Sequence, residues 1–377
     1  MSRITELLKG KHYEVWVEAG KDPVTGVRKR IVRRIKGSMR DARKLCAELE
    51  YQVEKGTYLK PENTTMNEYM KHWLATHKGN IAPSTFDGYE RIITGHIIPA
   101  MGQVLLFKLQ PAKLQSYYTQ KLTAGLSART VQQHHSVLRK ALNHAVQWGL
   151  IAKNPAHNTE PPNPQRATVR YINPDQIDSF VERVTYHRDG NLIACAVYTG
   201  MRQGELLALT WKNVDLDQGK ARVTQTVGHI RGEFIFRQKA KSKRSRREVA
   251  LDNKALAALR AQKKLVVSER LRESDYTDMD LVFPNEHGGP LNPTLLCRRF
   301  KRLVANTKHD ITFHSLRHTH ATYLLSIGIN PGIVQDRLGI ETIGILMDTY
   351  SHVTNKMQED VVRRMNEQTR ARKNGNY

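Results

Sequence analysis

A proline-rich segment interrupts the middle of this chain. Residues 154–164 contain four prolines. Proline has no backbone N–H and its ring clashes with the preceding helical turn, so neither a helix nor a central strand continues through such a segment. The 377 residues also exceed the ~100–200 residues of a common domain. We therefore expect separate folded units on either side, over residues 64–155 and 166–377, with a further unit at 1–60.

The predicted unit at residues 1–60 combines strands, one helix and positive charge. His12–Val17 alternates polar and apolar residues like a strand, and Arg28–Lys36 interleaves basic and β-branched residues. Met39–Glu54 has apolar residues at helical spacing. Ten Lys or Arg and two acids lie between Lys21 and Lys44. This composition favours a DNA-contacting sheet with a helix behind it; the alternative is an edge strand protected by its charge.

The next predicted unit, at residues 64–155, is almost entirely helical and follows a linker at Gly56–Pro61. Start signals precede several segments with apolar residues at helical spacing. These segments are Asn67–His77, Ser84–Ile97, Pro111–Ala124 and Ser127–Trp148. The adjacent His134 and His135 point to different faces of the last helix, so we expect surface or DNA-facing side chains rather than metal ligands.

The predicted unit at residues 166–377 mixes helices and strands. It begins with helical segments, continues with three short strands and returns to helices from Asn253 onward. The segments are Pro174–Thr185 and Asn191–Tyr198 for the helices, and Ala221–Val227, Glu233–Arg237 and Arg247–Leu251 for the strands.

Net charge indicates the partner. The chain has 60 Lys and Arg against 36 Asp and Glu, a net charge of +24. Such a charge favours nucleic acid, whose neutralised phosphates release counterions. An anionic membrane would require a basic amphipathic helix or a lipidation signal, and neither is found. Without a signal-peptide core or a long apolar run, we expect a cytoplasmic protein. Its three cysteines, Cys46, Cys195 and Cys297, form no CxxC pair and are expected to be buried free thiols.

Three segments contain the candidate catalytic residues: Thr199–Leu209, His314–Ala321 and Asp348–Val353. Each is weak evidence alone. An arginine at a helix start is usually a surface residue, and one tyrosine among fourteen is usually a packing residue. His314 and His318 have the spacing of zinc ligands, but the glutamate of an HExxH motif is missing.

Together the three segments indicate phosphoryl transfer. Two guanidiniums, Arg202 and Arg317, can bind non-bridging phosphate oxygens and stabilise the charge of a transition state. The phenol of Tyr350 can attack phosphorus, but its ordinary pKa of ~10 requires a base. His314 is the candidate base, and the lysines of residues 239–244 are candidate acids for the leaving oxygen.

These motifs, Thr-Gly-x-Arg-x-x-Glu, His-x-Leu-Arg-His-Thr-x-Ala and Asp-Thr-Tyr-Ser-His-Val, resemble those of tyrosine recombinases of the phage-integrase family. The likeness covers nearly the whole chain and is nearest to integrases of phages and conjugative transposons of Gram-positive bacteria. It implies a mainly α fold with small β-sheets, in the α+β class. The implied domains are a three-stranded arm-type DNA-binding domain at 1–60, a helical, SAM-like core-binding domain at 64–155 and a mixed α/β catalytic domain at 166–377.

The resemblance also assigns roles. Arg202, His314, Arg317 and the nucleophile Tyr350 match catalytic positions, and Glu205 matches an acidic residue that supports the site. Lys241 is the best match to the lysine of a β-hairpin, with Lys239 and Lys243 as alternatives. One position departs: Ile340 follows Leu-Gly where the family usually has histidine or tryptophan, and isoleucine donates no hydrogen bond to phosphate. The basic residues expected to contact DNA are Arg28, Lys29, Arg30, Arg33, Arg34, Lys36, Arg129, Lys140, Lys239, Lys243 and Arg244.

The activity implied is integration and excision of a mobile element through a 3′-phosphotyrosyl intermediate, without metal, ATP or other cofactor. The implied partners are double-stranded DNA with core-type and arm-type sites, three further copies in a tetramer, and an excisionase or host DNA-bending protein. The protein would be nucleoid-associated when bound to DNA. Two alternatives stay open: a type IB-like topoisomerase, and a catalytically impaired DNA-binding regulator, for which Ile340 is the motive.

Overall fold

The computed structural model describes residues 2–21, 28–54, 63–165, 169–238, 246–305, 307–342 and 344. The linker predicted at Gly56–Pro61 lies outside these residues. The chain divides into two compact units, residues 1–165 and residues 166–377. Small antiparallel sheets accompany the helices, so the predicted α+β class with mainly helical content is confirmed.

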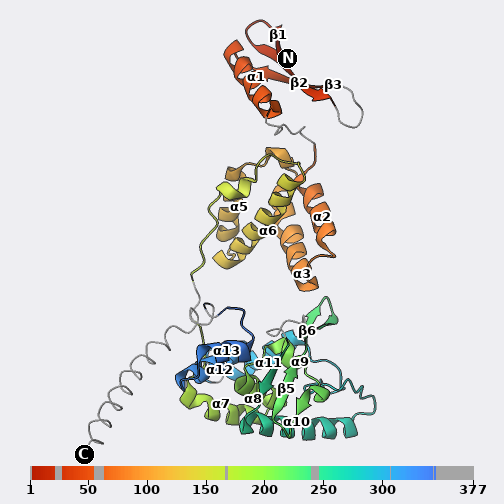
Figure 1. Ribbon diagram of the computed structural model, residues 1–377, viewed down its shortest axis with the longest axis vertical. Helices are drawn as coiled ribbons and strands as arrows, with labels where there is room; N and C mark the ends of the chain where they lie inside the picture. Colours follow the sequence, from red (N-terminus) through yellow and green to blue (C-terminus); the bar gives the residue numbers. More distant parts are fainter. Residues whose placement is uncertain are drawn as a thin grey trace, which may run out of the picture. The chain divides into compact units, whose positions relative to one another are not determined.

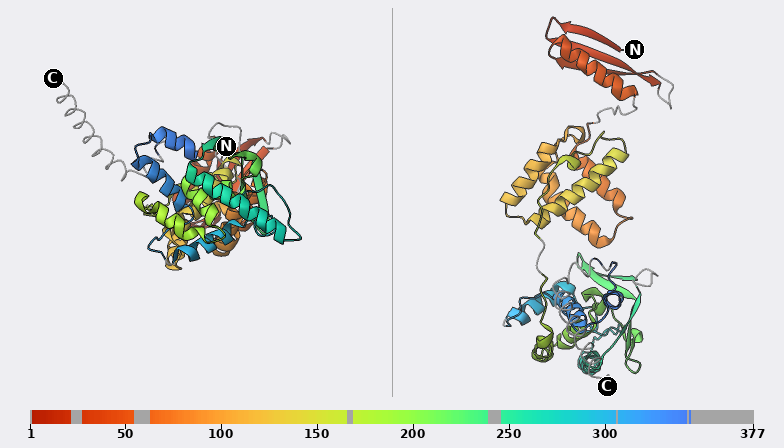
Figure 2. Two further views of the ribbon diagram at one scale, coloured as in Figure 1. Left: turned by 90° about the horizontal axis from the view of Figure 1, so that it is seen from below. Right: turned by 60° about the vertical axis from the view of Figure 1, so that its left-hand side comes forward.

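The first unit begins with a three-stranded antiparallel sheet and one helix. The strands β1 (Ser2–Leu8), β2 (His12–Lys21) and β3 (Arg28–Lys36) lie in the order β1-β2-β3. Helix α1 (Met39–Glu54) follows β3 and covers one face of the sheet (Figure 2, right). Alternate residues of β2 and β3 meet the helix in a small core, which explains the period-two pattern of the sequence.

The rest of the first unit is a helical bundle (Figure 1). Its helices are α2 (Met66–His77), α3 (Pro83–Ile92), α4 (Ile98–Met101), α5 (Pro111–Thr123) and α6 (Ala128–Gln147), with short turns η2 (Leu106–Lys108) and η3 (Pro155–Asn158). Thr65 and Glu68 form a capping box at the start of α2, and the Ser127 hydroxyl accepts from Thr130 N at the start of α6. The single helix expected at Ser84–Ile97 instead widens into a π-helical turn, η1 (Ile93–Ile97).

The two adjacent histidines of α6 are buried, so the expectation that they face solvent or DNA was wrong. His134 is 0% exposed and its Nδ1 lies 2.9 Å from the hydroxyl of Tyr117. His135 Nδ1 lies 2.9 Å from the hydroxyl of Tyr118. The consecutive tyrosines of α5 therefore each contact one of the consecutive histidines. Burial, with the nearby charges of His96 and Lys121, lowers the pKa of His134 to about 4.

The second unit is built around the buried helix α8 (Gly190–Thr199) (Figure 1). Helices α7 (Ile177–Thr185), α10 (Asn253–Arg272) and α12 (Ser315–Ser326) contact α8. The remaining helical elements are η4 (Pro174–Gln176), α9 (Gln203–Leu207), η5 (Trp211–Asn213), α11 (Pro293–Ala305) and α13 (Pro331–Leu338). Cys195 lies in this core and Cys46 in that of the first unit, but Cys297 is exposed on α11, so the expectation of three buried thiols was wrong there.

Two small antiparallel sheets complete the second unit. One contains β4 (Val214–Asp215), β5 (Lys220–Val223) and β8 (Arg247–Ala250), and the other is the hairpin of β6 (Gln225–Ile230) and β7 (Glu233–Gln238). The single strand expected at Ala221–Val227 is therefore two strands, because the chain leaves one sheet after Val223 and enters the other at Gln225. Among the described helices of both units, none is long and apolar enough to cross a membrane.

Candidate active site

A glycine and a capping turn position Arg202. Helix α8 ends at Gly200, whose φ of +64° is the left-handed conformation that glycine adopts without strain. Arg202 is the residue that caps α9, and the carboxylate of Glu205, one turn later, accepts from Arg202 N at 3.0 Å. The motif Thr-Gly-x-Arg-x-x-Glu is thus a helix stop followed directly by a helix start.

The carboxylate of Glu205 is shared by two guanidiniums. The Glu205 side chain is 1% exposed, and its Oε1 accepts from Arg202 Nη1 at 3.0 Å. Arg247, the first residue of β8, donates to Oε2 at 2.7 Å and to Oε1 at 3.2 Å. The predicted support of Arg202 by Glu205 therefore has a geometric basis, and the contact includes a second arginine that the sequence did not single out.

Arg317 lies beside Arg202. Arg317 is 6% exposed and donates to Gly200 O at 2.8 Å and to Leu338 O at 2.6 Å. Arg202 Nη2 donates to the next carbonyl, Gly339 O, at 2.8 Å. Because consecutive carbonyls accept from the two side chains, residues that are distant in sequence form one pair of neighbouring guanidiniums.

His314 stands at the start of α12, next to this pair. Surrounding protein atoms, and then the charges of Arg317 and Arg202, lower the pKa of His314 below its ordinary value of 6.5. The ring is consequently neutral at neutral pH and able to accept a proton. The rings of His314 and His318 meet edge to face at 5.0 Å, and burial lowers the pKa of His318 to about 4.

Ile340 takes the place of the expected polar residue. It is partly buried and packs on the apolar cluster of α12 and α13 that includes Leu325 and Leu338. Its N–H donates to Gln335 O at 3.0 Å, and its carbonyl accepts from Gln335 Nε2 at 3.2 Å. The side chain thus contributes apolar contact at this position.

The half-buried Arg337 and the buried His320 are further polar residues that the sequence did not single out. Arg337 Nε donates to His320 Nε2 at 2.9 Å, and its Nη1 donates to Ala250 O at 2.9 Å. Burial and the charge of Arg337 lower the pKa of His320 to about 3, so the ring is a neutral acceptor. These contacts join α12, α13 and β8. The alternation of β8 could have predicted that Arg247 is buried, because it lies on the same side of the strand as Val249. Nothing in the sequence indicates which residue it contacts.

Several predicted site residues lie outside the described residues. They are Tyr350 and the loop positions Lys239, Lys241, Lys243 and Arg244. The side chains of Arg28 and Lys29 are also among those the structure does not describe. From the predicted set, the structure therefore brings together Arg202, Glu205, His314, Arg317 and Ile340.

The register of the N-terminal sheet separates its basic residues into two groups. Arg34 lies opposite Glu14 and its Nε donates to that carboxylate at 2.7 Å, while Lys36 lies opposite His12, all on the face away from α1. Arg30 is on the same face, with its guanidinium 5.2 Å from the Trp16 ring centroid. Arg33 instead pairs with Val15, which is buried against α1. The open face is thus the cationic one, and Arg33 contributes little to it.

The two basic residues predicted on α6 differ in surroundings. Arg129, in its first turn, is exposed. Lys140 is half-buried, with its ammonium 5.5 Å from the ring centroid of Tyr89. Both remain able to contact a ligand, since the long lysine stem carries its charge outward.

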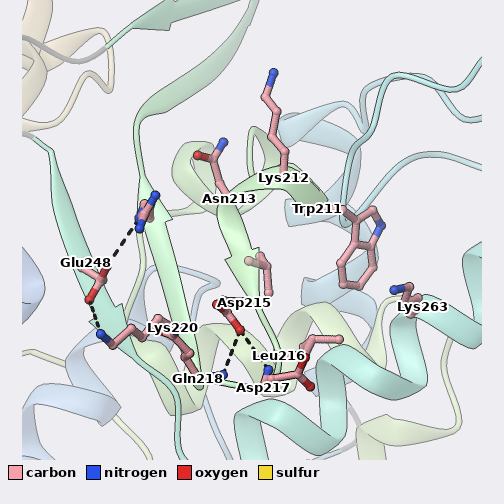
Figure 3. Close-up of a pocket in the computed structure, with 12 residues that line it drawn as sticks. Trp211, Lys212, Asn213, Asp215, Leu216, Asp217, Gln218, Lys220, Glu248 and Lys263 are labelled. Atoms are coloured by element: carbon pink, nitrogen blue, oxygen red, sulfur yellow. Dashed lines mark hydrogen bonds and ion pairs between the residues drawn. The ribbon is translucent and has the colours of Figure 1, made fainter.

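A polar pocket on the solvent side of β4 and β5 is separate from the arginine pair (Figure 3). Basic and acidic side chains alternate in its lining: Lys220 and Arg222 each lie 3.4 Å from a carboxylate oxygen of Glu248. Asp215 accepts from the backbone of its own turn. The lining of this pocket therefore mixes carboxylates with basic side chains and contains neither Arg202 nor Arg317.

The arginine pair and the neutral imidazole form a suitable site for a tetrahedral anion. Guanidiniums offer several N–H donors to phosphate oxygens, and a neutral histidine beside them can move a proton. Within the described ranges, no three His, Cys, Asp or Glu residues gather where they could hold a metal ion.

Comparisons with known proteins agree with this chemistry. The chain matches the model of the phage integrase family over residues 170–357, and that of a phage integrase N-terminal SAM-like domain over residues 65–122. Tyrosine recombinase XerC of Xylella fastidiosa (strain 9a5c) is 31% identical to it, over 68% of this chain and 81% of the relative. The ICEBs1 integrase of Bacillus subtilis (strain 168) is 23% identical, over 96% of this chain and 98% of the relative.

Solved structures share the fold. The Tn1549 transposon integrase in complex with a circular intermediate DNA has a TM-score of 0.68 and 20% identity, over 79% of this chain and 99% of the other. A lambda integrase tetramer bound to a Holliday junction has a TM-score of 0.59 and 17% identity, over 92% of this chain and 95% of the other.

Proposed function

This chain belongs to the phage integrase family and is a site-specific tyrosine recombinase, and we propose that it integrates and excises a mobile element through a 3′-phosphotyrosyl bond at Tyr350. The observation that supports this most directly is the convergence of Arg202 and Arg317 on consecutive carbonyls beside a neutral His314. The matches to the family and to its relatives confirm the resemblance inferred from the motifs at the level of the family.

The cleavage step follows from these groups. The Tyr350 oxygen attacks the phosphorus, the bond from phosphorus to the 5′ oxygen breaks, and a free 5′-hydroxyl leaves. His314 accepts the tyrosine proton, and Lys241 supplies a proton to the leaving oxygen. The two guanidiniums offset the charge that gathers on the non-bridging oxygens. Religation reverses the step with the hydroxyl of a partner strand, so no ATP, metal or other cofactor is consumed.

DNA recognition is divided among three domains in this proposal. Residues 1–60 bind arm-type sites, 64–155 bind core-type sites and 166–377 carry out the chemistry, in a homotetramer that holds two duplexes. The cationic open face of the N-terminal sheet supports the arm-type role, because a short sheet with basic side chains on one face fits a DNA groove. An excisionase or host DNA-bending protein completes the set of partners.

The test is covalent capture on a suicide DNA duplex that carries the end of the element. The native protein is expected to form an adduct that survives denaturation, with phosphotyrosine at residue 350. Tyr350→Phe should bind the same duplex with unchanged affinity and form no adduct. Tyr186→Phe is the matched control, because Tyr186 is 96% exposed and outside the site, and should form the adduct at the native rate.

Two other outcomes would redirect the assignment. Because the Ile340 side chain has no donor for a phosphate oxygen, a native protein that binds the duplex but forms no adduct would support an impaired DNA-binding regulator. A protein that relaxes supercoiled plasmid equally well with and without paired sites, and exchanges no strands, would support a type IB-like topoisomerase.

A further inference from the structure

Arg247 is a buried cation that the proposed chemistry does not use. Its side chain is 5% exposed, although it stands at the start of a strand in a chain of net charge +24. Removing a guanidinium from water is costly unless every part of it is compensated. A charged residue retained at such a position therefore calls for an explanation beyond packing.

All three side-chain nitrogens of Arg247 donate hydrogen bonds. Both Nη atoms donate to the carboxylate of Glu205, and Nε donates to Arg337 O at 2.7 Å. Glu205 is itself buried and also bonds the backbone and the guanidinium of Arg202. The three side chains form a row, Arg247, Glu205 and Arg202, in which the middle carboxylate contacts both guanidiniums.

The two ends of the row differ in exposure. The Arg202 side chain is 43% exposed, whereas those of Glu205 and Arg247 are nearly inaccessible. Water screens charge poorly around buried groups, so the charges in the row act strongly on one another. The row carries two positive charges and one negative charge, and the surplus positive charge is at the accessible end.

We propose that Arg247 is a positioning residue that neutralises Glu205, so that Glu205 orients Arg202 without cancelling its charge toward phosphate. This inference rests on the proposed function of Arg202 as a phosphate-binding group. With Arg247 absent, the buried carboxylate would have Arg202 as its guanidinium partner and would draw it into a neutral pair. The contact from Arg202 to Gly339 O, which places it beside Arg317, would then weaken.

The proposal makes a charge-specific prediction that a packing role does not make. A methylphosphonate has no negative charge, so replacing the phosphate that Arg202 contacts by a methylphosphonate should reduce affinity only while Arg202 is an effective cation. A charge-assisted hydrogen bond to phosphate supports a penalty of about tenfold. When Glu205 neutralises the charge of Arg202, most of that loss of affinity should disappear.

The experiment is a neutral-phosphate scan in the Tyr350→Phe background of the full chain. Duplexes carrying the end of the element, each with one methylphosphonate, are titrated at a fixed salt concentration because salt changes DNA affinity strongly. The phosphate that Arg202 contacts is the one whose penalty disappears in Arg202→Gln. At this phosphate, Arg247→Gln should reduce the penalty from about tenfold to within about twofold.

Three variants separate charge from folding. Glu205→Gln/Arg247→Gln removes both buried charges and should recover most of the penalty, since Arg202 regains its net charge while an amide oxygen still accepts from its backbone. Arg247→Lys retains a cation beside Glu205 and should also recover part of it. Arg222→Gln is the matched control, because Arg222 is 72% exposed on β5 and pairs with Glu248; it should keep the full penalty.

An Arg247→Gln protein that keeps the full penalty at this phosphate overturns the proposal. So does a double variant that is no better than Arg247→Gln, because the defect would then be structural. The scan requires binding and no cleavage. Absence of an adduct from the protein with intact Tyr350 would therefore contradict the recombinase chemistry without changing what the scan shows about Arg247.

Discussion

Replacing Gly200 by alanine should destabilise the second unit by about 2–5 kcal/mol, from two separable costs. The φ of Gly200 is +64°, and a left-handed backbone costs an alanine roughly 1–2 kcal/mol. The added Cβ would also lie 2.5 Å from Leu338 Cδ2 and 2.7 Å from His320 Cδ2. Both neighbours are buried, and overpacking of such a core costs about 1–3 kcal/mol.

A matched control isolates the backbone cost. Gly232, in the turn between β6 and β7, has a φ of +89° but nothing within 4 Å of an added Cβ. Gly232→Ala should therefore cost only the backbone part, roughly 1–2 kcal/mol. Gly228, with equally open space and no positive φ, should tolerate alanine with a change of about 0.5 kcal/mol or less.

Native-state hydrogen exchange on the full chain is the suitable assay, because it assigns stability to segments rather than to the whole molecule. Peptides from α8 and α12 should exchange faster in Gly200→Ala by the factor that corresponds to about 2–5 kcal/mol. Peptides from the helical bundle should be unchanged. If Gly200→Ala lowers the free energy of unfolding no more than Gly232→Ala does, then Leu338 and His320 move aside without a packing penalty and the packing argument is refuted.

Other predictions concern the pH dependence of stability, the role of Ile340 and the open face of the N-terminal sheet. The pKa of His134 is near 6.5 in the unfolded chain and about 4 in the folded one, so between these values the unfolded chain binds the proton more tightly. The free energy of unfolding should therefore be about 3 kcal/mol lower at pH 4 than above pH 6.5. Hydrogen exchange of α5 and α6 should report this loss, and His134→Gln should flatten it. Ile340→His should raise the rate of adduct formation by up to ~10²-fold if a missing phosphate donor limits cleavage; an unchanged rate would show that another group supplies it. Lys36→Ala should weaken binding to arm-type duplexes and reduce the salt dependence by about one phosphate contact, whereas Arg33→Ala should do neither.

Local signals in the sequence predicted most of the elements. Helix α1 spans the expected residues, and α5 and α6 differ from expectation by a residue at their ends, because proline, serine and the apolar spacing act within one or two turns. The pair of strands β5 and β6 was expected as one, since the change of sheet at Thr224 is set by tertiary packing and leaves no break in the alternation.

The contacts that define the site could be predicted only in part. The motifs indicated that Arg202, His314 and Arg317 act together, but not that consecutive carbonyls at the end of α13 hold the two guanidiniums. Surface placement of His134 was a reasonable inference from its neighbours, and it was wrong because Tyr117 supplies a buried partner from another helix. Arg247 was overlooked for the same reason, because its role depends on a buried hydrogen bond to Glu205, a residue distant in sequence.

In the proposed cleavage step, the hydrogen bonds of Arg202 and Arg317 to the end of α13 also limit how far Tyr350 can lie from a phosphate bound by these arginines. Nine residues lie between Ile340 and Tyr350, so ten Cα-to-Cα steps join them. A fully extended chain covers ~3.3–3.6 Å per residue, so Tyr350 can lie no farther than about 35 Å from Ile340. A phosphate held by the arginines of the same subunit is well inside that radius. In the proposed homotetramer, a phosphate held by a neighbouring subunit is accessible only when the two arginine pairs approach within that radius. The proposed cleavage therefore makes the spacing of bound subunits along DNA the limit on which strand each Tyr350 can cut.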